Sequence, residues 1–292
     1  MRKNIFLIFM FGAMIAWGAS WSSIKIMNEY LPTAELVFVR YAITALSSFF
    51  IVIILRQRFA IDRQSLLIAF LVALLTAVYG YVVFMGTQLG SASLAGAFIN
   101  AFSPINTFIL LALFYKHAIQ KLDICALCLG FLGTMMMLGV WQFNAQKIFT
   151  AYNLYFVLGA FLWSLITIAS SHIKVNVVVF SFYMYSLTAV MVLAFTDLNV
   201  IISSNTDMRF WLNTLFVSVI STSIATTLFF LGTKKLGAEK VSSFMFIAPA
   251  SAVIVGALAL GERLNLFTLI GIAASILAVY MLNRIWIFKS HK

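Results

Sequence analysis

The chain has 292 residues, of which 63% are hydrophobic and 9% are charged, and its net charge is +11. Soluble domains contain about 45–50% apolar and about 25% charged residues, so a soluble fold could not bury this much apolar surface. The basic residues stand singly at the ends of apolar runs and form no patch with interleaved aromatic residues, which argues against nucleic-acid binding.

Apolar runs of about 20 residues recur along the whole chain, and each can cross a hydrocarbon core of about 30 Å. The first run is too long for a signal peptide and lacks a small-residue cleavage site before Lys25, so we expect it to be retained. The longest loop, 196–210, is too short to hold a soluble domain. The sequence predicts one all-α membrane domain with ten transmembrane helices at 5–24, 33–55, 65–86, 92–114, 123–141, 152–171, 176–195, 211–232, 240–260 and 265–286.

The Lys and Arg residues are distributed unequally between the two sides of this predicted topology. With the N-terminus inside, fourteen of the nineteen lie on inner segments and four lie on outer loops, while Arg40 lies within a helix. Short loops rich in Lys and Arg remain in the cytoplasm. The bias therefore predicts that both termini are cytoplasmic.

The two cysteines of the chain, Cys125 and Cys128, form a C-x-x-C pattern inside an apolar run. Neither the strand and helix context of a redox motif nor a second pair of zinc ligands accompanies them. We therefore assign both cysteines to helix packing and predict no metal and no other cofactor.

The chain contains an internal repeat. Matching residues lie 145 to 147 positions apart, and half of the chain is 146 residues: Trp17 and Trp163, Ala13 and Gly159, Gly86-Thr87 and Gly232-Thr233, Leu89-Gly90 and Leu236-Gly237, and Pro104 and Pro249. A repeat of five helices must place its second copy upside down in the membrane, as in many secondary transporters. The sequence thus predicts two inverted five-helix repeats, 1–146 and 147–292, with a substrate site between them.

Several short motifs resemble the EamA-type family of the drug/metabolite transporter superfamily. They are Trp17-Gly18-Ala19-Ser20-Trp21, Pro32, Arg40, Leu236-Gly237-Ala238-Glu239, Pro249 and Leu260-Gly261-Glu262-Arg263. The resemblance implies a ten-helix carrier in the cell inner (plasma) membrane, commonly an exporter of amino acids or related metabolites. The first repeat departs from the pattern, because Tyr115-Lys116-His117 stands where a small residue followed by Glu is expected, so the class transfers and the substrate does not.

Polar and aromatic residues at i, i+4 spacing mark helix faces that either pack against neighbours or line a cavity. We predict that one such group surrounds a central substrate cavity: Trp17, Trp21, Arg40, Tyr79, Asn100, Trp163, Thr167, Thr222 and Thr226. The tryptophans lie mid-helix, away from the interfaces where Trp is enriched, and a mid-helix amide is costly in hydrocarbon without a partner. Packing of these side chains between helices is the alternative.

Arg40 is the one strongly basic residue well inside a predicted span. It either binds an acidic group in the cavity or has a structural role, reaching toward the interface or pairing with Glu35. Glu262 lies in a turn beside Arg263, where a loop role is expected. Pro104 and Pro249 are predicted hinges, since each proline removes one backbone hydrogen bond from its helix.

No Asp, Glu or His lies near the middle of a predicted span, which leaves proton coupling and uncoupled exchange both open. The absence of nucleophile–base pairs and of metal-ligand spacing argues against an enzyme. We predict a secondary transporter that exports a small metabolite, such as an amino acid or a related compound, by alternating access. A channel, sensor or assembly factor is the alternative, and an integral membrane transferase a weaker one. The expected partners are the substrate and the lipid bilayer, with protons and a homodimer as open options.

Overall fold

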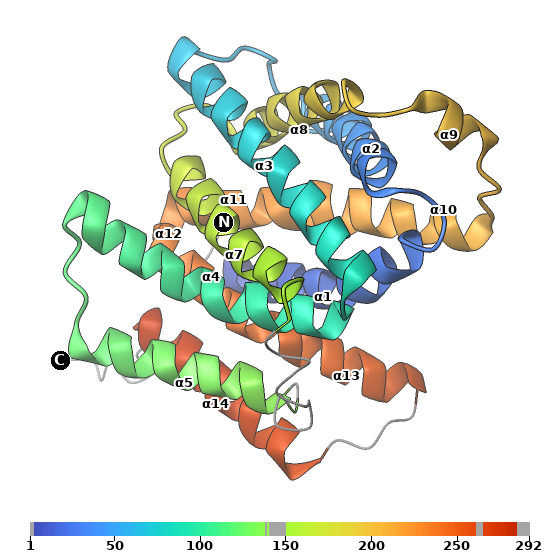
Figure 1. Ribbon diagram of the computed structural model, residues 1–292. Helices are drawn as coiled ribbons and strands as arrows, with labels where there is room; N and C mark the ends of the chain where they lie inside the picture. The colour runs from blue at the N-terminus through green and yellow to red at the C-terminus, as the bar shows by residue number, and fades with distance from the viewer. Residues whose placement is uncertain (1–2, 138, 140–149, 261–264, 285–292) are drawn as a thin grey trace.

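The computed structural model describes residues 3–137, 139, 150–260 and 265–284, and every regular element in these ranges is helical (Figure 1). The first half contains α1 (Lys3–Met27), α2 (Thr33–Ile54), α3 (Arg63–Leu89), α4 (Ala92–Tyr115) and α5 (Lys121–Met137). The second half contains α7 (Asn153–Ser170), α8 (Val177–Leu193), α9 (Leu198–Ser203), α10 (Met208–Leu215), a π-helix (Phe216–Thr226), α11 (Thr227–Leu236), α12 (Ala238–Ser243), a 3₁₀ turn (Phe244–Ile247), α13 (Ala248–Leu260) and α14 (Leu266–Leu282). Glu262 and the predicted boundary between residues 146 and 147 lie outside the described residues.

Short polar side chains fix where several helices begin. Asp62, Asn176, Asp197, Asp207 and Asn265 stand directly before α3, α8, α9, α10 and α14, and each accepts a hydrogen bond from a backbone N–H of the first turn. The first N–H groups of a helix have no partner within the helix, so such caps are worth about 1 kcal/mol each. The Ser65 hydroxyl and backbone N–H hold the pKa of the Asp62 carboxyl group below its usual value, and the backbone N–H of Phe210 does the same at Asp207.

Five described helical segments are long and apolar enough to cross a membrane: Thr33–Ile54, Arg63–Leu89, Ala92–Tyr115, Asn153–Ser170 and Met208–Leu236. Two shorter apolar helices, α8 and α14, accompany them. The chain is therefore an all-α membrane protein, as predicted, while the count of ten spanning helices stays a prediction.

The second half is less regular than the sequence predicts. The predicted span 211–232 lies within one continuous segment that changes from α-helix to π-helix and back. The predicted span 240–260 is broken into α12, the 3₁₀ turn and α13. An additional short helix, α9, occupies part of the loop predicted at 196–210.

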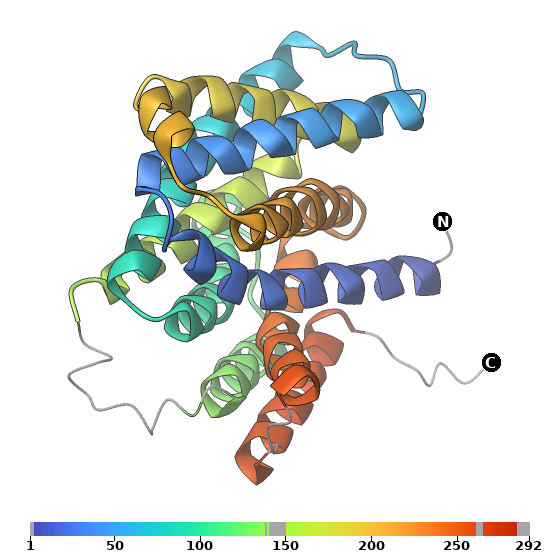
Figure 2. The ribbon, with the colours of Figure 1, turned by 90° about the vertical axis from the view of Figure 1, so that its right-hand side faces the viewer.

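The contacts between helices have the same pattern in both halves. Two pairs join equivalent helices directly: α2 packs on α8, and α5 packs on α14. Other contacts occur twice, once in each direction. Helix α4 contacts α7 as its equivalent α13 contacts α1, and α3 contacts α7 as the equivalent π-helix contacts α1. Exchanging the two halves therefore maps each of these contacts onto itself or onto another of them, as a pseudo-twofold axis requires. The α2–α8 pair and the α5–α14 pair lie at opposite ends of the bundle, with the other helices between them (Figures 1 and 2).

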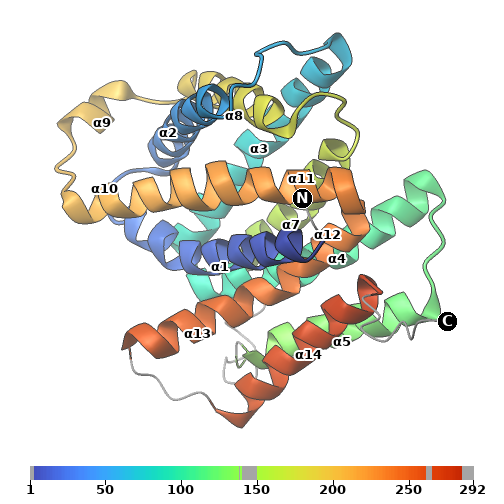
Figure 3. The ribbon, with the colours of Figure 1, turned by 180° about the vertical axis from the view of Figure 1, so that it is seen from behind.

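Two equivalent crossings join the halves. In the α1–α13 crossing, a Cβ atom on Gly18 would overlap the carbonyl oxygen of Ala248. In the α7–α4 crossing, the Ser164 hydroxyl donates to the carbonyl oxygen of Ser103 at 2.9 Å. Gly18 and Ser164 are 146 residues apart, and Ser103 and Ala248 are 145 apart, so both crossings bring equivalent backbones together. Figure 3 shows α1 lying between α11 and α13.

Hydrogen bonds between loops sort them into two groups at opposite ends of the helices. The α7–α8 loop meets the α2–α3 loop, where Asn176 donates to Gln57 at 2.7 Å. The start of α10 meets the α1–α2 loop, where Arg209 forms an ion pair with Glu29 at 3.0 Å. These are the loops that the charge bias assigns to opposite sides of the membrane.

Cys125 and Cys128 are free thiols on α5, and both side chains are exposed. Their assignment to helix packing is therefore wrong, because this face of α5 points outward. Among the described residues, no group of three or more His, Cys, Asp or Glu side chains could hold a metal ion.

Candidate functional site

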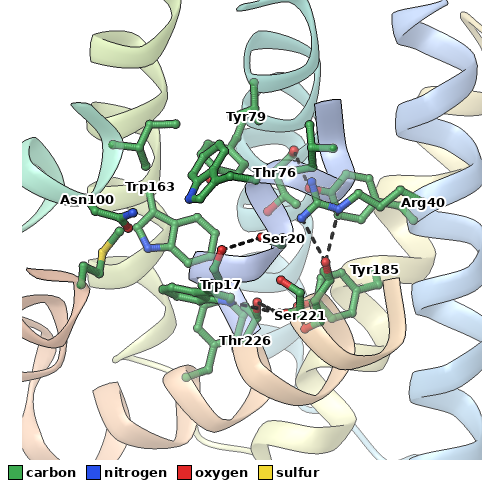
Figure 4. A pocket seen from close by; sticks show the side chains of 18 of the residues that line it. Trp17, Ser20, Arg40, Thr76, Tyr79, Asn100, Trp163, Tyr185, Ser221 and Thr226 are labelled. Atoms are coloured by element: carbon green, nitrogen blue, oxygen red, sulfur yellow. Dashed lines mark hydrogen bonds between the residues drawn. The ribbon is translucent and has the colours of Figure 1, made fainter. Parts of the chain in front are cut away.

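A cavity lies at the centre of the bundle, between the two halves (Figure 4). Helices α1, α2, α3, α4, α7 and α8 line it, together with the π-helix, α11 and the 3₁₀ turn. Its lining residues are Trp17, Ser20, Trp21, Ile24, Arg40, Tyr41, Thr76, Tyr79, Val83, Ile99, Asn100, Trp163, Met184, Tyr185, Ser221, Thr222, Thr226, Phe230 and Met245. The cavity therefore collects residues that are as many as 228 positions apart in the chain.

Equivalent positions of the two repeats meet across this cavity. Three pairs of lining residues are separated by 146 positions: Trp17 and Trp163, Thr76 and Thr222, and Ile99 and Met245. The rings of Trp17 and Trp163 are in contact, with centroids 5.2 Å apart and planes at 86°. The cavity thus lies where the pseudo-twofold axis relates one half of the chain to the other.

The π-helix forms one wall, and its own threonines help to stabilise its unusual hydrogen bonding. The hydroxyls of Thr222 and Thr226 donate to the carbonyls five residues earlier, of Val217 at 2.7 Å and Ser221 at 3.3 Å. The Ser221 carbonyl also accepts a hydrogen bond from Trp17 Nε1 at 3.0 Å. A π-helix, whose backbone N–H groups bond to carbonyls five residues earlier, is a rare element that often occurs at functional sites.

One face of α2 is hydrogen-bonded to the π-helix. Arg40, Thr44 and Ser48 follow one another at four-residue spacing, so their side chains share a face. Thr44 donates to the carbonyl of Ser218 at 3.1 Å, and the hydroxyls of Ser48 and Ser223 are hydrogen-bonded at 2.8 Å. These contacts tie the cavity wall to a regular helix of the first repeat.

Arg40 extends from α2 into the cavity and is only 8% exposed. Its Nε and Nη2 atoms donate to the Thr222 hydroxyl oxygen at 3.2 and 3.0 Å, and its guanidinium lies 5.3 Å from the ring centroid of Tyr41. Glu35, the alternative partner considered from the sequence, accepts instead from the backbone N–H of Asp197 at 3.2 Å. Arg40 therefore has no ion pair with a described acidic residue.

Five buried polar atoms around the cavity have no hydrogen-bond partner in the described structure. They are Trp21 Nε1, Arg40 Nη1, Thr76 Oγ1, Asn100 Nδ2 and Trp163 Nε1. Four of them are nitrogen atoms that can only donate. A buried donor without an acceptor costs about 1–3 kcal/mol, so this concentration of free donors indicates a site for a ligand or for water.

The space in this conformation is small. The cavity offers about 50 Å³ to the centres of water-sized molecules, whereas one water needs roughly 10–15 Å³ by the same measure. It therefore has room for a few waters, and a metabolite requires the aromatic side chains to move apart.

The cavity contains eight of the nine side chains that the sequence suggests for substrate binding, and Thr167 is the exception. Thr167 is fully buried, and its hydroxyl donates to the carbonyl of Trp163 at 2.7 Å, one turn earlier in the same helix. It points into the helix contact and not into the cavity. Whether the other eight bind a substrate stays a prediction.

The two predicted hinges have different surroundings. Pro104 is buried inside the continuous helix α4, whereas Pro249 is the second residue of α13, directly after the 3₁₀ turn. Each proline follows the residue whose carbonyl lies in a crossing between the halves, Ser103 or Ala248. A change of backbone angle at either proline would therefore be transmitted to the opposite half.

Several cavity residues were not predicted from the sequence. Thr76 lies 146 residues before Thr222, so the repeat offset is a sequence signal that predicts it. Tyr41 and Tyr185 are 144 residues apart, and their rings stack with centroids 6.1 Å apart. Ser221 offers its backbone carbonyl, for which no side-chain pattern exists.

A central cavity shared by two equivalent halves of an apolar helical bundle is the architecture of a membrane transporter. The sequence pattern of the EamA-like transporter family matches residues 4–139 and again residues 150–284. The chain therefore belongs to the EamA-like transporter family and contains two copies of its repeat, as the motifs predict.

A comparison with solved structures supports the same fold. The chain is similar to a protein of known crystal structure with a TM-score of 0.73, and the similarity covers 96% of each chain. The two are 15% identical, so this likeness concerns the fold alone. No curated protein sequence matches the chain.

Proposed function

We propose that this protein is a secondary transporter of the inner (plasma) membrane that exports a small metabolite, such as an amino acid or a related compound, by alternating access. The observation that carries the proposal is the cavity lined by equivalent residues of both repeats. In a carrier with inverted repeats, rocking one half against the other opens such a site to each side in turn. Aromatic walls with a few polar groups suit a small organic molecule.

Transport by the purified protein in liposomes tests this proposal. We expect exchange of a labelled metabolite across the bilayer when a panel of amino acids, carboxylates and amines is supplied on the opposite side. Exchange should saturate with concentration, because a carrier binds its substrate in every cycle. Flux that rises linearly with concentration would instead support a channel.

The proposed orientation predicts the results of reporter fusions. Reporters placed within 56–64 and after residue 292 should be cytoplasmic, and those within 142–151 and 197–208 should be external. The reason is that fourteen basic residues would face the cytoplasm and four the outside. An external reporter at the C-terminus would contradict the predicted topology, in which both termini are cytoplasmic.

The prolines at the crossings should influence the rate of the conformational change. We expect Pro104→Ala and Pro249→Ala to slow exchange by up to about tenfold, or about 1.4 kcal/mol in activation free energy, with little loss of folded protein. Pro32→Ala is the matched control, because Pro32 is exposed at the start of α2 and lies outside both crossings. Unchanged rates in both variants would remove the hinge role.

A further inference from the structure

We propose that the cavity binds a small organic acid, with its carboxylate on Arg40 and a second hydrogen-bond acceptor at the Trp21, Asn100 and Trp163 end. This inference narrows the proposed transport function to a substrate class. It rests on the chemistry of the cavity wall, which supplies a cation and free donors and lacks a counter-charge.

Arg40 carries a positive charge that forms no ion pair with a described acidic side chain. An isolated cation inside a membrane protein costs several kcal/mol unless an anion or strong acceptors compensate it. Here one threonine hydroxyl accepts from two guanidinium nitrogens, and Nη1 has no partner. Among the described residues, no Asp or Glu lines the cavity. A ligand carboxylate would supply the missing charge and would fit the planar guanidinium in two-point fashion.

The side of the cavity away from Arg40 offers hydrogen-bond donors that have no acceptor. Figure 4 shows Asn100 and Arg40 on opposite sides of Trp17 and Trp163. The nitrogens of Asn100, Trp21 and Trp163 are all free donors, and the Trp21 indole lies against Gly96, one helical turn before Asn100 in α4. A carboxylate, carbonyl or hydroxyl oxygen would satisfy them, because oxygen lone pairs are what these nitrogens require.

The polar atoms that remain free around the cavity do not suit an ammonium group as the second polar group of the ligand. An ammonium has three donors and needs acceptors or a carboxylate. Of the five polar atoms around the cavity that have no partner within the described residues, four are nitrogens that can only donate, and the Thr76 hydroxyl alone could accept. An acid with a neutral or anionic second group therefore matches the wall better than a molecule with a free amine.

Four compounds with one carbon skeleton test this inference by binding. Succinate, succinamate, 4-aminobutanoate and 1,4-diaminobutane differ only in their end groups. We expect the first two to raise the melting temperature of the purified protein most, 4-aminobutanoate to do so less, and the diamine not at all. Equal stabilisation by the diamine and succinate, or no stabilisation by either acid, would overturn the proposal.

Variants of Arg40 provide the matching test. Arg40→Gln should weaken succinate binding at least tenfold, and Arg40→Lys should weaken it less, because lysine keeps the charge and loses the planar fork. Thr222 still donates to Val217 without Arg40, so the unliganded variants should melt close to the parent protein. Arg209→Gln, which removes an exposed basic group at the loops, should leave binding unchanged. Unaltered succinate binding by Arg40→Gln would refute the assignment of the carboxylate site.

Exchange in liposomes separates this inference from the transport function. If succinate binds in an Arg40-dependent way but no tested compound is exchanged, the organic-acid site is supported and the carrier function is refuted. If an amine is exchanged saturably and Arg40→Gln does not change that exchange, the carrier function is supported and the organic-acid site is refuted.

Discussion

Substituting Gly18 with leucine is expected to prevent α1 from packing against α13 and so to reduce the folded protein at least fivefold. Even a single Cβ atom would lie 2.9 Å from the backbone nitrogen of Ala252 and would overlap the carbonyl of Ala248. Both obstacles are backbone atoms, which cannot rotate away as a flexible side chain can. Small residues permit this kind of close contact between membrane helices, where burial of apolar surface gives no advantage over lipid.

Gly12→Leu is the matched control for this substitution. Gly12 lies on the same helix, and a Cβ atom placed there would have no neighbour within 4 Å. Folded yield is measured as the monodisperse fraction after extraction in mild detergent. Similar yields for the two leucine variants would mean that the α1–α13 crossing is looser than described.

Replacing Trp163 with alanine is expected to cost about 3–5 kcal/mol of stability, the usual range for a buried aromatic residue. Its ring lies among four others, with centroids 5.1 Å from Tyr79, 5.2 Å from Trp17, 5.8 Å from Phe229 and 6.4 Å from Phe230. The residue thus both packs the bundle and lines the cavity. Loss of transport by the alanine variant could not distinguish these two roles.

Trp163→Phe separates packing from binding. Phenylalanine keeps most of the ring contacts and removes the free Nε1 donor. We expect nearly unchanged melting and an affinity for succinate reduced about two- to tenfold, as for one neutral hydrogen bond. Trp211→Ala, at an exposed position on α10, is the control for loss of an indole. Unchanged affinity in Trp163→Phe would show that the indole only packs.

The repeat accounts for most of what could be predicted about this site. Trp17 and Trp163 meet because equivalent positions of inverted halves face the same axis, and the 146-residue offset is visible in the sequence. The same offset relates Thr222 to Thr76, which the spacing of helix faces does not single out. Thr167 shares a helix face with Trp163 by spacing, yet its hydroxyl turns back to a carbonyl of its own helix.

The irregular backbone of the second half could not be predicted from periodicity. Hydrophobic patterns locate a span but do not distinguish α from π hydrogen bonding, which here involves donors from distant helices. Trp17 and Thr44 bind carbonyls of the π-helix from 204 and 174 residues away. The hydrogen-bond partner of Arg40 could not be predicted either. Glu35 is near Arg40 in the sequence, whereas Thr222, its partner in the structure, is 182 residues away.

In the carrier cycle proposed above, the membrane potential would act on the unpaired charge of Arg40. Moving one elementary charge through 100 mV changes the free energy by about 2.3 kcal/mol. The cavity of the empty carrier is positive, and a bound monoanion makes it neutral. Voltage would then drive the return of the empty carrier and leave the loaded step nearly unaffected. A dianion such as succinate would make the loaded cavity negative, so both halves of the cycle would respond to voltage, and the number of charges on the substrate determines whether the loaded step responds.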